Sequence, residues 1–158
     1  MIALPPEIAD GCHRHTIRVY VEDTDAGGII YHANYLRYAE RGRSEALRVL
    51  GCPHADMMRA HGRMFVVRRA ELDYERPGQL DDQITVETRV LAVRAARVVL
   101  AQTIVREAVT LVRIGLDLAC VSVAEGRPAR LPPAMRAALE AMRDSGETSG
   151  GGAALEGT

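Results

Sequence analysis

The sequence predicts an α+β domain in which an antiparallel sheet covers one long helix. Apolar residues recur at helical spacing between positions 34 and 50. Four runs rich in Val, Ile, Leu and Thr follow between positions 64 and 124, as in β-strands. The links between these runs are shorter than the roughly dozen residues that a parallel crossover needs. We therefore expect antiparallel hairpins packed against the helix.

The chain is expected to begin with an arm and a strand. Residues 1–13 contain two prolines and no clear period. From His15 to Glu22, alternation places Ile17, Val19 and Val21 on one face, as in a half-buried strand. The acidic, glycine-rich run that follows is expected to turn.

A long helix is expected next. Asn34 is a suitable N-cap, because its side chain can accept a hydrogen bond from the first free amides. Gly51 is placed to end the helix, and a shorter helix after Pro53 extends to about His61. The apolar positions of the long helix are Leu36, Ala39, Ala46 and Leu50.

Four strands and a final helix complete the predicted domain. The strands are expected at Met64–Glu75, Gln83–Val93, Arg97–Arg106 and Thr110–Ala124. Pro132-Pro133 then opens a helix to about Arg143, since proline is tolerated in a first helical turn. We predict one domain over residues 14–143, and a disordered tail over 144–158 because that segment is rich in Gly, Ser and Glu.

Composition narrows the function classes. The 158 residues fit one domain, because domains typically span roughly 100–150 residues. A net charge of -1 gives no overall basic field to attract nucleic acid, and the absence of lysine excludes a Schiff-base or Walker lysine. The three cysteines are widely spaced, which favours a reducing, cytoplasmic setting over a disulfide framework. No stretch approaches the ~18 apolar residues of a membrane span.

Three candidate catalytic residues lie just ahead of the long helix. Asp25, Tyr31 and His32 share a short segment, and exposed amides at a helix N-terminus favour developing negative charge. A carboxylate there can activate water or attack a carbonyl, while the amides stabilise the oxyanion. Taken singly, Asp25 is explained by turn formation and His32 by its place near a helix start. Together the residues suit acyl transfer, above all from a thioester.

The segment from Glu22 to Leu36 reads EDTDAGGIIYHANYL. It resembles the signature of the Tol-Pal-associated acyl-CoA thioesterases, which have the hot-dog fold of the 4-hydroxybenzoyl-CoA thioesterase type. Further matching segments are Glu40-Arg41, Arg43-Ser44-Glu45, Phe65-Val66-Val67-Arg68, Arg76-Pro77, Leu80-Asp81-Asp82 and Arg127-Pro128. The resemblance extends over about residues 14–143.

This resemblance implies a curved antiparallel sheet of about five strands around a central helix. It implies hydrolysis of acyl-CoA thioesters without a cofactor, with Asp25 as nucleophile or general base. His32 would lie beside Asp25, and Tyr31 with nearby backbone amides would bind the thioester carbonyl. A homodimer or homotetramer with the active site between protomers is also implied. Relatives commonly carry a second Tyr where this chain has Val21, so a hydroxyl is missing there.

Basic residues are expected to contact the phosphates of CoA. The candidates are Arg63, Arg68, Arg69, Arg94 and Arg97. A solvated charge on a strand face is an equally good interpretation of each. No metal site is expected, because Glu22 and Asp23 near Asp25 lack the further oxygen ligands or His and Cys pairs that metals require.

Two alternative functions stay open at this point. A hot-dog dehydratase or hydratase would abstract a proton from carbon and would yield an enoyl thioester instead of free CoA. A non-catalytic acyl-thioester binding or scaffold protein, linked to envelope or lipid metabolism, is the other. The presence of both Asp25 and His32 argues against this third function.

Overall fold

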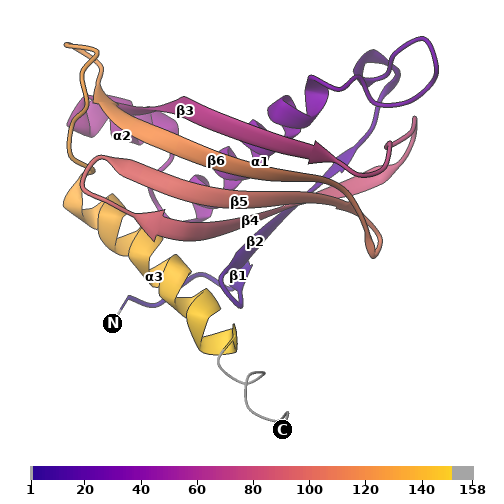
Figure 1. Ribbon diagram of the computed structural model, residues 1–158. Helices are drawn as coiled ribbons and strands as arrows, with labels where there is room; N and C mark the ends of the chain where they lie inside the picture. Colours follow the sequence, from indigo (N-terminus) through magenta and orange to yellow (C-terminus); the bar gives the residue numbers. More distant parts are fainter. Residues whose placement is uncertain (1, 151–158) are drawn as a thin grey trace, which may run out of the picture.

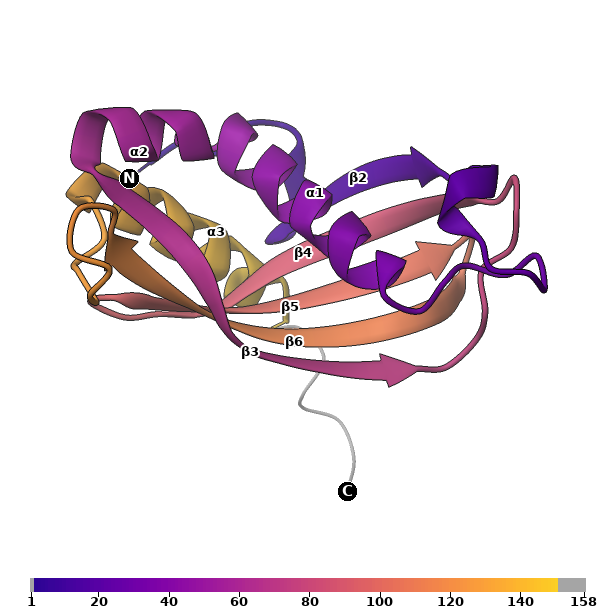
Figure 2. The same ribbon diagram turned by 90° about the horizontal axis from the view of Figure 1, so that it is seen from above.

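The computed structural model describes residues 2–150, with side chains through residue 147. Its six strands form one antiparallel sheet in the order β1-β2-β4-β5-β6-β3. The strands are β1 Ile8–Ala9, β2 Cys12–Arg18, β3 Arg63–Tyr74, β4 Gln83–Val93, β5 Arg97–Arg106 and β6 Val109–Ser122. The sheet curves around helix α1, Asn34–Val49 (Figures 1 and 2). The predicted α+β arrangement is confirmed.

Helix α1 packs directly on the sheet. A Cβ added at Gly42 would lie 2.5 Å from Val86 Cγ1 on β4, so only glycine permits this approach without movement. The buried face of α1 includes Tyr35 and Tyr38, whereas Leu36 is 40% exposed. Leu36, one of the four apolar positions at helical spacing, therefore does not belong to the buried face. The large tyrosine rings, and not the leucine, fill the space under the sheet.

Two further helices flank the far end of α1. Helix α2, His54–His61, ends at Gly62 in the left-handed conformation and agrees with the predicted segment. Helix α3 spans Pro133–Gly150 and packs mainly against β4 (Figure 1). Residues 144–150 are thus helical, which corrects the predicted disordered tail, and residues 151–158 lie outside the described part of the chain.

The N-terminal prediction also needs correction. Residues 8–9 and 12–13 belong to the sheet, so the arm expected over residues 1–13 is partly strand. Strand β2 ends at Arg18, and a short 3-10 helix, η1 Val21–Asp23, follows. Val19 is fully buried but Val21 is 72% exposed, because the chain turns away from the sheet between them.

The link between β3 and β4 is not a hairpin. The two strands follow each other in the chain, but β3 pairs with β6 at the opposite edge of the meander β4-β5-β6. The intervening residues 75–82 cross the end of the sheet instead. This crossing brings them against the loop that contains Asp25, where they help to build the site.

Candidate active site

The loop after β2 is fixed by backbone pairing with residues 81 and 82. Val19 N donates to Asp82 O at 2.9 Å, and Asp81 N donates to Val19 O at 3.0 Å. Within the loop, Tyr20 N donates to Asp23 Oδ2 at 2.9 Å. These hydrogen bonds take over where the pairing of β2 with β4 ends, and they direct the chain away from the sheet at η1.

Asp25 stands on a small hairpin. Its N donates to Ile29 O at 2.9 Å, and Gly28 adopts φ +77 at the tip. Gly27 N donates to Asp25 Oδ1 at 2.8 Å, so the carboxylate does shape the turn, as an Asx turn does. The other carboxylate oxygen has no partner among the described residues, and the side chain is exposed. It is therefore free to act on a ligand.

Gly78 holds the base of this hairpin to the crossing segment. Ile30 N donates to Gly78 O at 2.8 Å, and Gly78 N donates to Tyr35 Oη at 3.0 Å. A Cβ at Gly78 would lie 2.4 Å from Ile30 Cδ1. The hairpin, the crossing segment and the first turn of α1 are thus joined at one residue.

Asp23 O is a second anchor, shared by two donors. Asn34 Nδ2 donates to it at 2.7 Å and Tyr31 N at 2.9 Å. Asn34 is the first residue of α1 and is buried, while Ala33 occupies the N-cap position. The prediction of Asn34 as the N-cap is wrong, because its side chain bonds back to the loop and not to the free amides of the helix.

His32 and Tyr31 lie together at the start of α1. Their ring centroids are 4.6 Å apart, and Tyr74 Oη donates to His32 O at 3.1 Å. An open groove beside them is lined by Ile29, Ile30, His32, Tyr35, Tyr74, Glu75, Arg76 and Pro77. Asp25 does not line this groove, and no hydrogen bond or ion pair joins Asp25 to His32 among residues 2–147. The structure therefore brings two of the three candidates into contact and leaves Asp25 on the neighbouring hairpin.

Some amides at the start of α1 are available to a ligand. Those of Asn34 and Leu36 are taken by Tyr31 O and Ala33 O, at 2.9 and 3.2 Å. Within the described chain, no hydrogen-bond acceptor is found for the N–H groups of His32, Ala33 and Tyr35. Unpaired N–H groups at a helix start attract anions, so these are the candidate oxyanion donors.

Two buried tyrosines underlie the loop, and sequence reasoning missed both. Burial raises the pKa of Tyr35, and burial together with the nearby Asp23 carboxylate raises the pKa of Tyr38. Both hydroxyls are therefore neutral at neutral pH. Among residues 2–147, Tyr38 Oη has no hydrogen-bond partner. Both tyrosines lie at helical spacing on the face of α1 that is buried, and this spacing is the signal in the sequence that could have identified them. The apolar pattern counted only aliphatic residues and so left them out.

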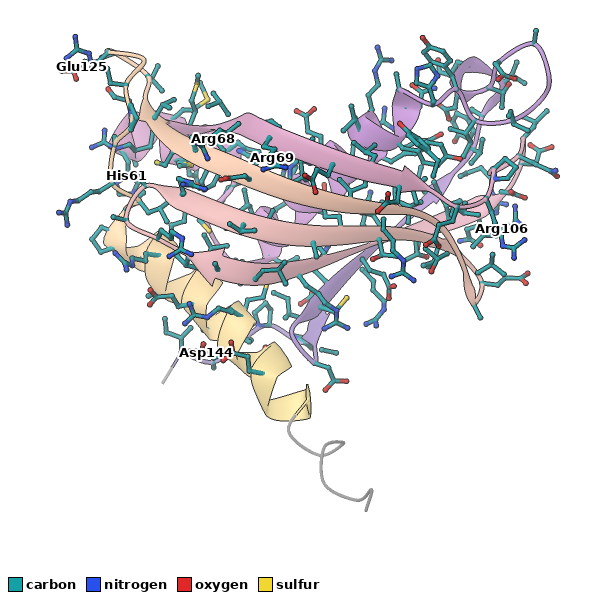
Figure 3. All side chains as sticks on the ribbon, viewed as in Figure 1. His61, Arg68, Arg69, Arg106, Glu125 and Asp144 are labelled. Carbon is teal, nitrogen blue, oxygen red and sulfur yellow. The ribbon has the colours of Figure 1, made fainter. Side chains whose placement is uncertain are left out.

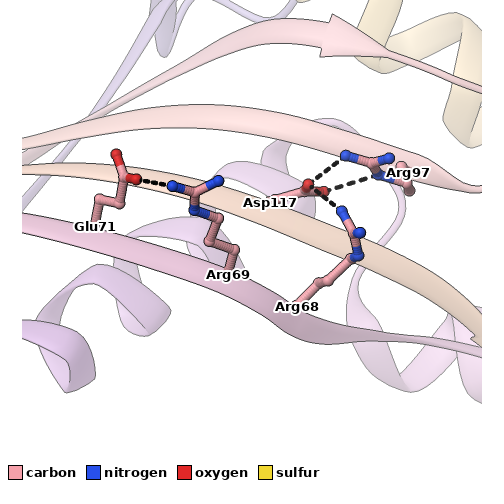
Figure 4. Close-up of polar contacts among 5 residues, drawn as sticks. All are labelled: Arg68, Arg69, Glu71, Arg97 and Asp117. Carbon is pink, nitrogen blue, oxygen red and sulfur yellow. Dashed lines mark hydrogen bonds and ion pairs between the residues drawn. The ribbon is translucent and has the colours of Figure 1, made fainter.

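The five candidate arginines lie elsewhere in the same chain. Arg68 and Arg97 pair with Asp117, and Arg69 pairs with Glu71, on the sheet face opposite α1 (Figure 4). Arg63 Nε donates to Arg130 O at 3.2 Å, and Arg94 is exposed. Figure 3 shows Arg68 and Arg69 far from Arg106, which lies at the end of the sheet nearer the Asp25 loop. The 12 residues of β3 extend roughly 35 Å, so Arg63 and Tyr74 are far apart.

Neither a metal cluster nor a membrane helix is found in the described residues. No group of three or more His, Cys, Asp or Glu side chains in residues 2–147 could hold a metal ion. No helix in the described part of the chain is long and apolar enough to cross a membrane. All three cysteines are unpaired, and Cys12 and Cys120 are buried.

Comparison with known proteins gives one consistent family. The model of the thioesterase-like superfamily matches residues 19–139. The acyl-CoA thioesterase YbgC of Haemophilus influenzae is 36% identical over 127 residues, which cover 80% of this chain and 93% of that protein. The acyl-CoA thioester hydrolase YbgC of Escherichia coli O6:H1 is 38% identical over 120 residues, covering 75% and 89%.

A solved structure agrees with these relatives. The "Probable Thioesterase" of Bartonella henselae has 39% sequence identity and a TM-score of 0.73. The match covers 77% of this chain and 99% of that chain. Both the fold and the sequence therefore point to the same family.

Proposed function

Since the chain belongs to the thioesterase-like superfamily, we propose that it hydrolyses acyl-CoA thioesters and that Asp25 carries the reaction. The observation that carries this proposal is the geometry of Asp25. One carboxylate oxygen is fixed by Gly27 N, and the other is exposed and unpaired among the described residues. Unpaired amides lie at the adjacent helix start, where an oxyanion would be stabilised.

Two routes use this carboxylate. As a general base, Asp25 accepts a proton from water while the water oxygen attacks the thioester carbonyl carbon. As a nucleophile, Asp25 forms an anhydride that water then hydrolyses. In both routes the C–S bond breaks and CoA leaves as a thiolate, which takes up a proton. The products are a free acid and CoA.

Neighbouring groups would orient the substrate. The N–H groups of His32, Ala33 and Tyr35 are the proposed donors to the developing oxyanion. The bond from Tyr74 Oη to His32 O fixes the backbone of that segment. The His32 ring, which contacts the Tyr31 ring, would border the approach to the carbonyl.

A homodimer, or a homotetramer built from it, completes the proposal. Strand β3 is an edge of the sheet, so its outer backbone groups can pair with a second copy. Antiparallel pairing of two β3 strands about a two-fold axis sets the Arg63 end of one against the Tyr74 end of the other. Arg63 or Arg68 of a second copy would then reach CoA phosphates, whereas Arg63 and Arg68 of the same chain lie toward the other end of the sheet. The three unpaired cysteines suit a reducing, cytoplasmic setting.

Release of free thiol from acyl-CoAs of short, long and aromatic acyl groups tests the function. Asp25→Asn should lower kcat/KM by roughly 10²–10⁴-fold, the range for loss of a positioned acid or base. Its melting temperature should stay close to the wild-type value, because Asp25 is exposed. Glu22→Gln is the matched control, an exposed acid in the same loop, and should retain activity.

The reaction product distinguishes a thioesterase from a dehydratase or hydratase. If the Asp25→Asn variant still released thiol at the parental rate, Asp25 would have no role in the reaction. Formation of an enoyl thioester without thiol release would instead identify a dehydratase or hydratase.

A further inference from the structure

A second site lies at the other end of α1. A cavity of about 150 Å³ is lined by the C-terminal half of α1, the start of α2, α3 and strands β3 to β6. None of Asp25, Tyr31 and His32 lines it. Arg43 lies nine residues beyond Asn34, or roughly 14 Å along the helix axis. The cavity is therefore separate from the loop described above.

Most of the cavity wall is apolar. The wall includes one leucine from each of α1, the sheet and α3, namely Leu47, Leu100 and Leu139. An apolar cavity of about 150 Å³ can accommodate a ligand such as benzene. The shape thus suits one short aliphatic chain or one aromatic ring.

One cation faces this apolar space. Arg43 is half-buried, and its Nη1 donates to Gln102 Oε1 at 3.1 Å. Gln102 is itself fixed, because its Nε2 donates to Ala39 O and Thr88 Oγ1, both at 2.9 Å. Arg43 makes no ion pair with any described residue. A guanidinium has five N–H groups, so a single neutral acceptor leaves most of them unused.

The other ionisable groups at the cavity do not neutralise Arg43. His54 is half-buried, and burial, with a contribution from Arg43, lowers its pKa. It is therefore an uncharged imidazole at neutral pH. Glu40 also borders the cavity and its charge attracts Arg43, but its side chain is exposed to solvent and no ion pair joins the two residues. Water and salt screen such an exposed charge.

We propose that this cavity binds a carboxylic acid with a short apolar tail, its carboxylate paired with Arg43. A carboxylate matches the planar guanidinium and would supply the missing countercharge, while the tail would occupy the apolar space. The site stands on the cavity and on Arg43, independently of the chemistry proposed for Asp25. If Asp25 does release acids of this class, the hydrolysis product would also fill this second site.

Calorimetric titration of the full chain at pH 7 tests the site. The probes are hexanoate and 1-hexanol, which differ in charge but share an apolar tail. Hexanoate should bind at least about tenfold more tightly than 1-hexanol, as expected for a charge-assisted pair. Arg43→Met should remove that preference and leave 1-hexanol binding nearly unchanged. Arg37→Met, an exposed arginine of the same helix, should keep the preference.

Two more variants keep the result decisive. Ala46→Leu fills the cavity while Arg43 stays, so it should abolish binding of both probes even where Arg43→Met fails to fold. Asp25→Asn should bind hexanoate like the wild type. The proposal is overturned by equal affinity for the two probes, by no hexanoate binding, or by loss of binding in Asp25→Asn alone. None of these outcomes affects the thiol-release test of Asp25.

Discussion

At the N-terminal end of α1, the loop with Asp25 is exposed and polar, and hydrogen bonds to Asp23 and Gly78 hold it. At the C-terminal end, packed side chains line a mostly apolar cavity with one cation, Arg43. The first end presents unpaired amides and a carboxylate to solvent, whereas the second partly buries a guanidinium beside apolar side chains. One helix thus carries two kinds of binding chemistry, and a change at either end should leave the other intact.

The largest effect on stability is expected at the contact between α1 and strand β4, because this contact holds both ends of the helix in place. Gly42→Ala places a Cβ 2.5 Å from Val86 Cγ1 and should destabilise the protein by about 1–3 kcal/mol, since overpacking displaces the helix. Thermal and urea unfolding measure this change. Arg41→Ala, on the exposed side of the helix, should shift stability by under about 0.5 kcal/mol. Equal stability of the two variants would show that α1 has room to move.

The next effect should be confined to the N-terminal end. Asn34→Ala removes the bond from Asn34 Nδ2 to Asp23 O and should cost about 1 kcal/mol, because Tyr31 N still satisfies that carbonyl. Hydrogen exchange should become faster for amides of residues 20–31, with no change in α3. Equal acceleration at both ends would contradict the separation of the two regions.

A smaller, pH-dependent effect is expected on the sheet face opposite α1. Arg97, with Arg68, holds the pKa of the Asp117 carboxyl below its usual value. The unfolded chain therefore binds a proton more readily, so the pair stabilises the fold above about pH 3.9 and loses this effect as pH falls through the lower folded-state pKa.

Asp117→Asn tests this expectation. Unfolding should be slightly easier than in wild type at pH 7, and the difference should shrink at the acidic end of the titration. Glu107→Gln, an acid in the turn between β5 and β6, serves as the control. A stability difference that grows as pH falls below 4 would reverse the assigned sign.

The smallest effect is expected for Tyr38→Phe. The hydroxyl is buried and no hydrogen-bond partner for it is found in the described part of the chain, so removing it should change stability by less than about 0.5 kcal/mol. Chemical unfolding and thiol release both measure the outcome. A loss above about 1 kcal/mol, together with faster exchange in the loop, would show that Tyr38 supports Asp23 directly.

Much of the fold could be predicted from the sequence. The bounds of β4 and β5 agree with the observed ones, because alternating apolar residues and short turns define them locally. Local patterns do not specify which strands pair. The position of β3 beside β6 depends on packing around α1, and the exposure of Val21 depends on the backbone bonds of Val19 to the distant residues 81 and 82.

The site was predictable in part. The segment with Asp25, Tyr31 and His32 was found because acidic, glycine-rich and helix-start signals coincide there. Gly78 and Tyr74 were missed, since they reach the loop only through the fold. The cavity beside Arg43 was also invisible, because in the sequence Arg43 is one of several charges on an amphipathic helix.

The strand order has a consequence for how the protein folds. The meander β4-β5-β6 forms from hairpins that close short loops, whereas β3 must join β6 from far earlier in the chain. Loop-closure entropy makes such distant contacts slow, so α1 and β3 are expected to dock after the meander exists. During synthesis, the Asp25 segment would leave the ribosome early yet acquire its final shape only when the last strands arrive.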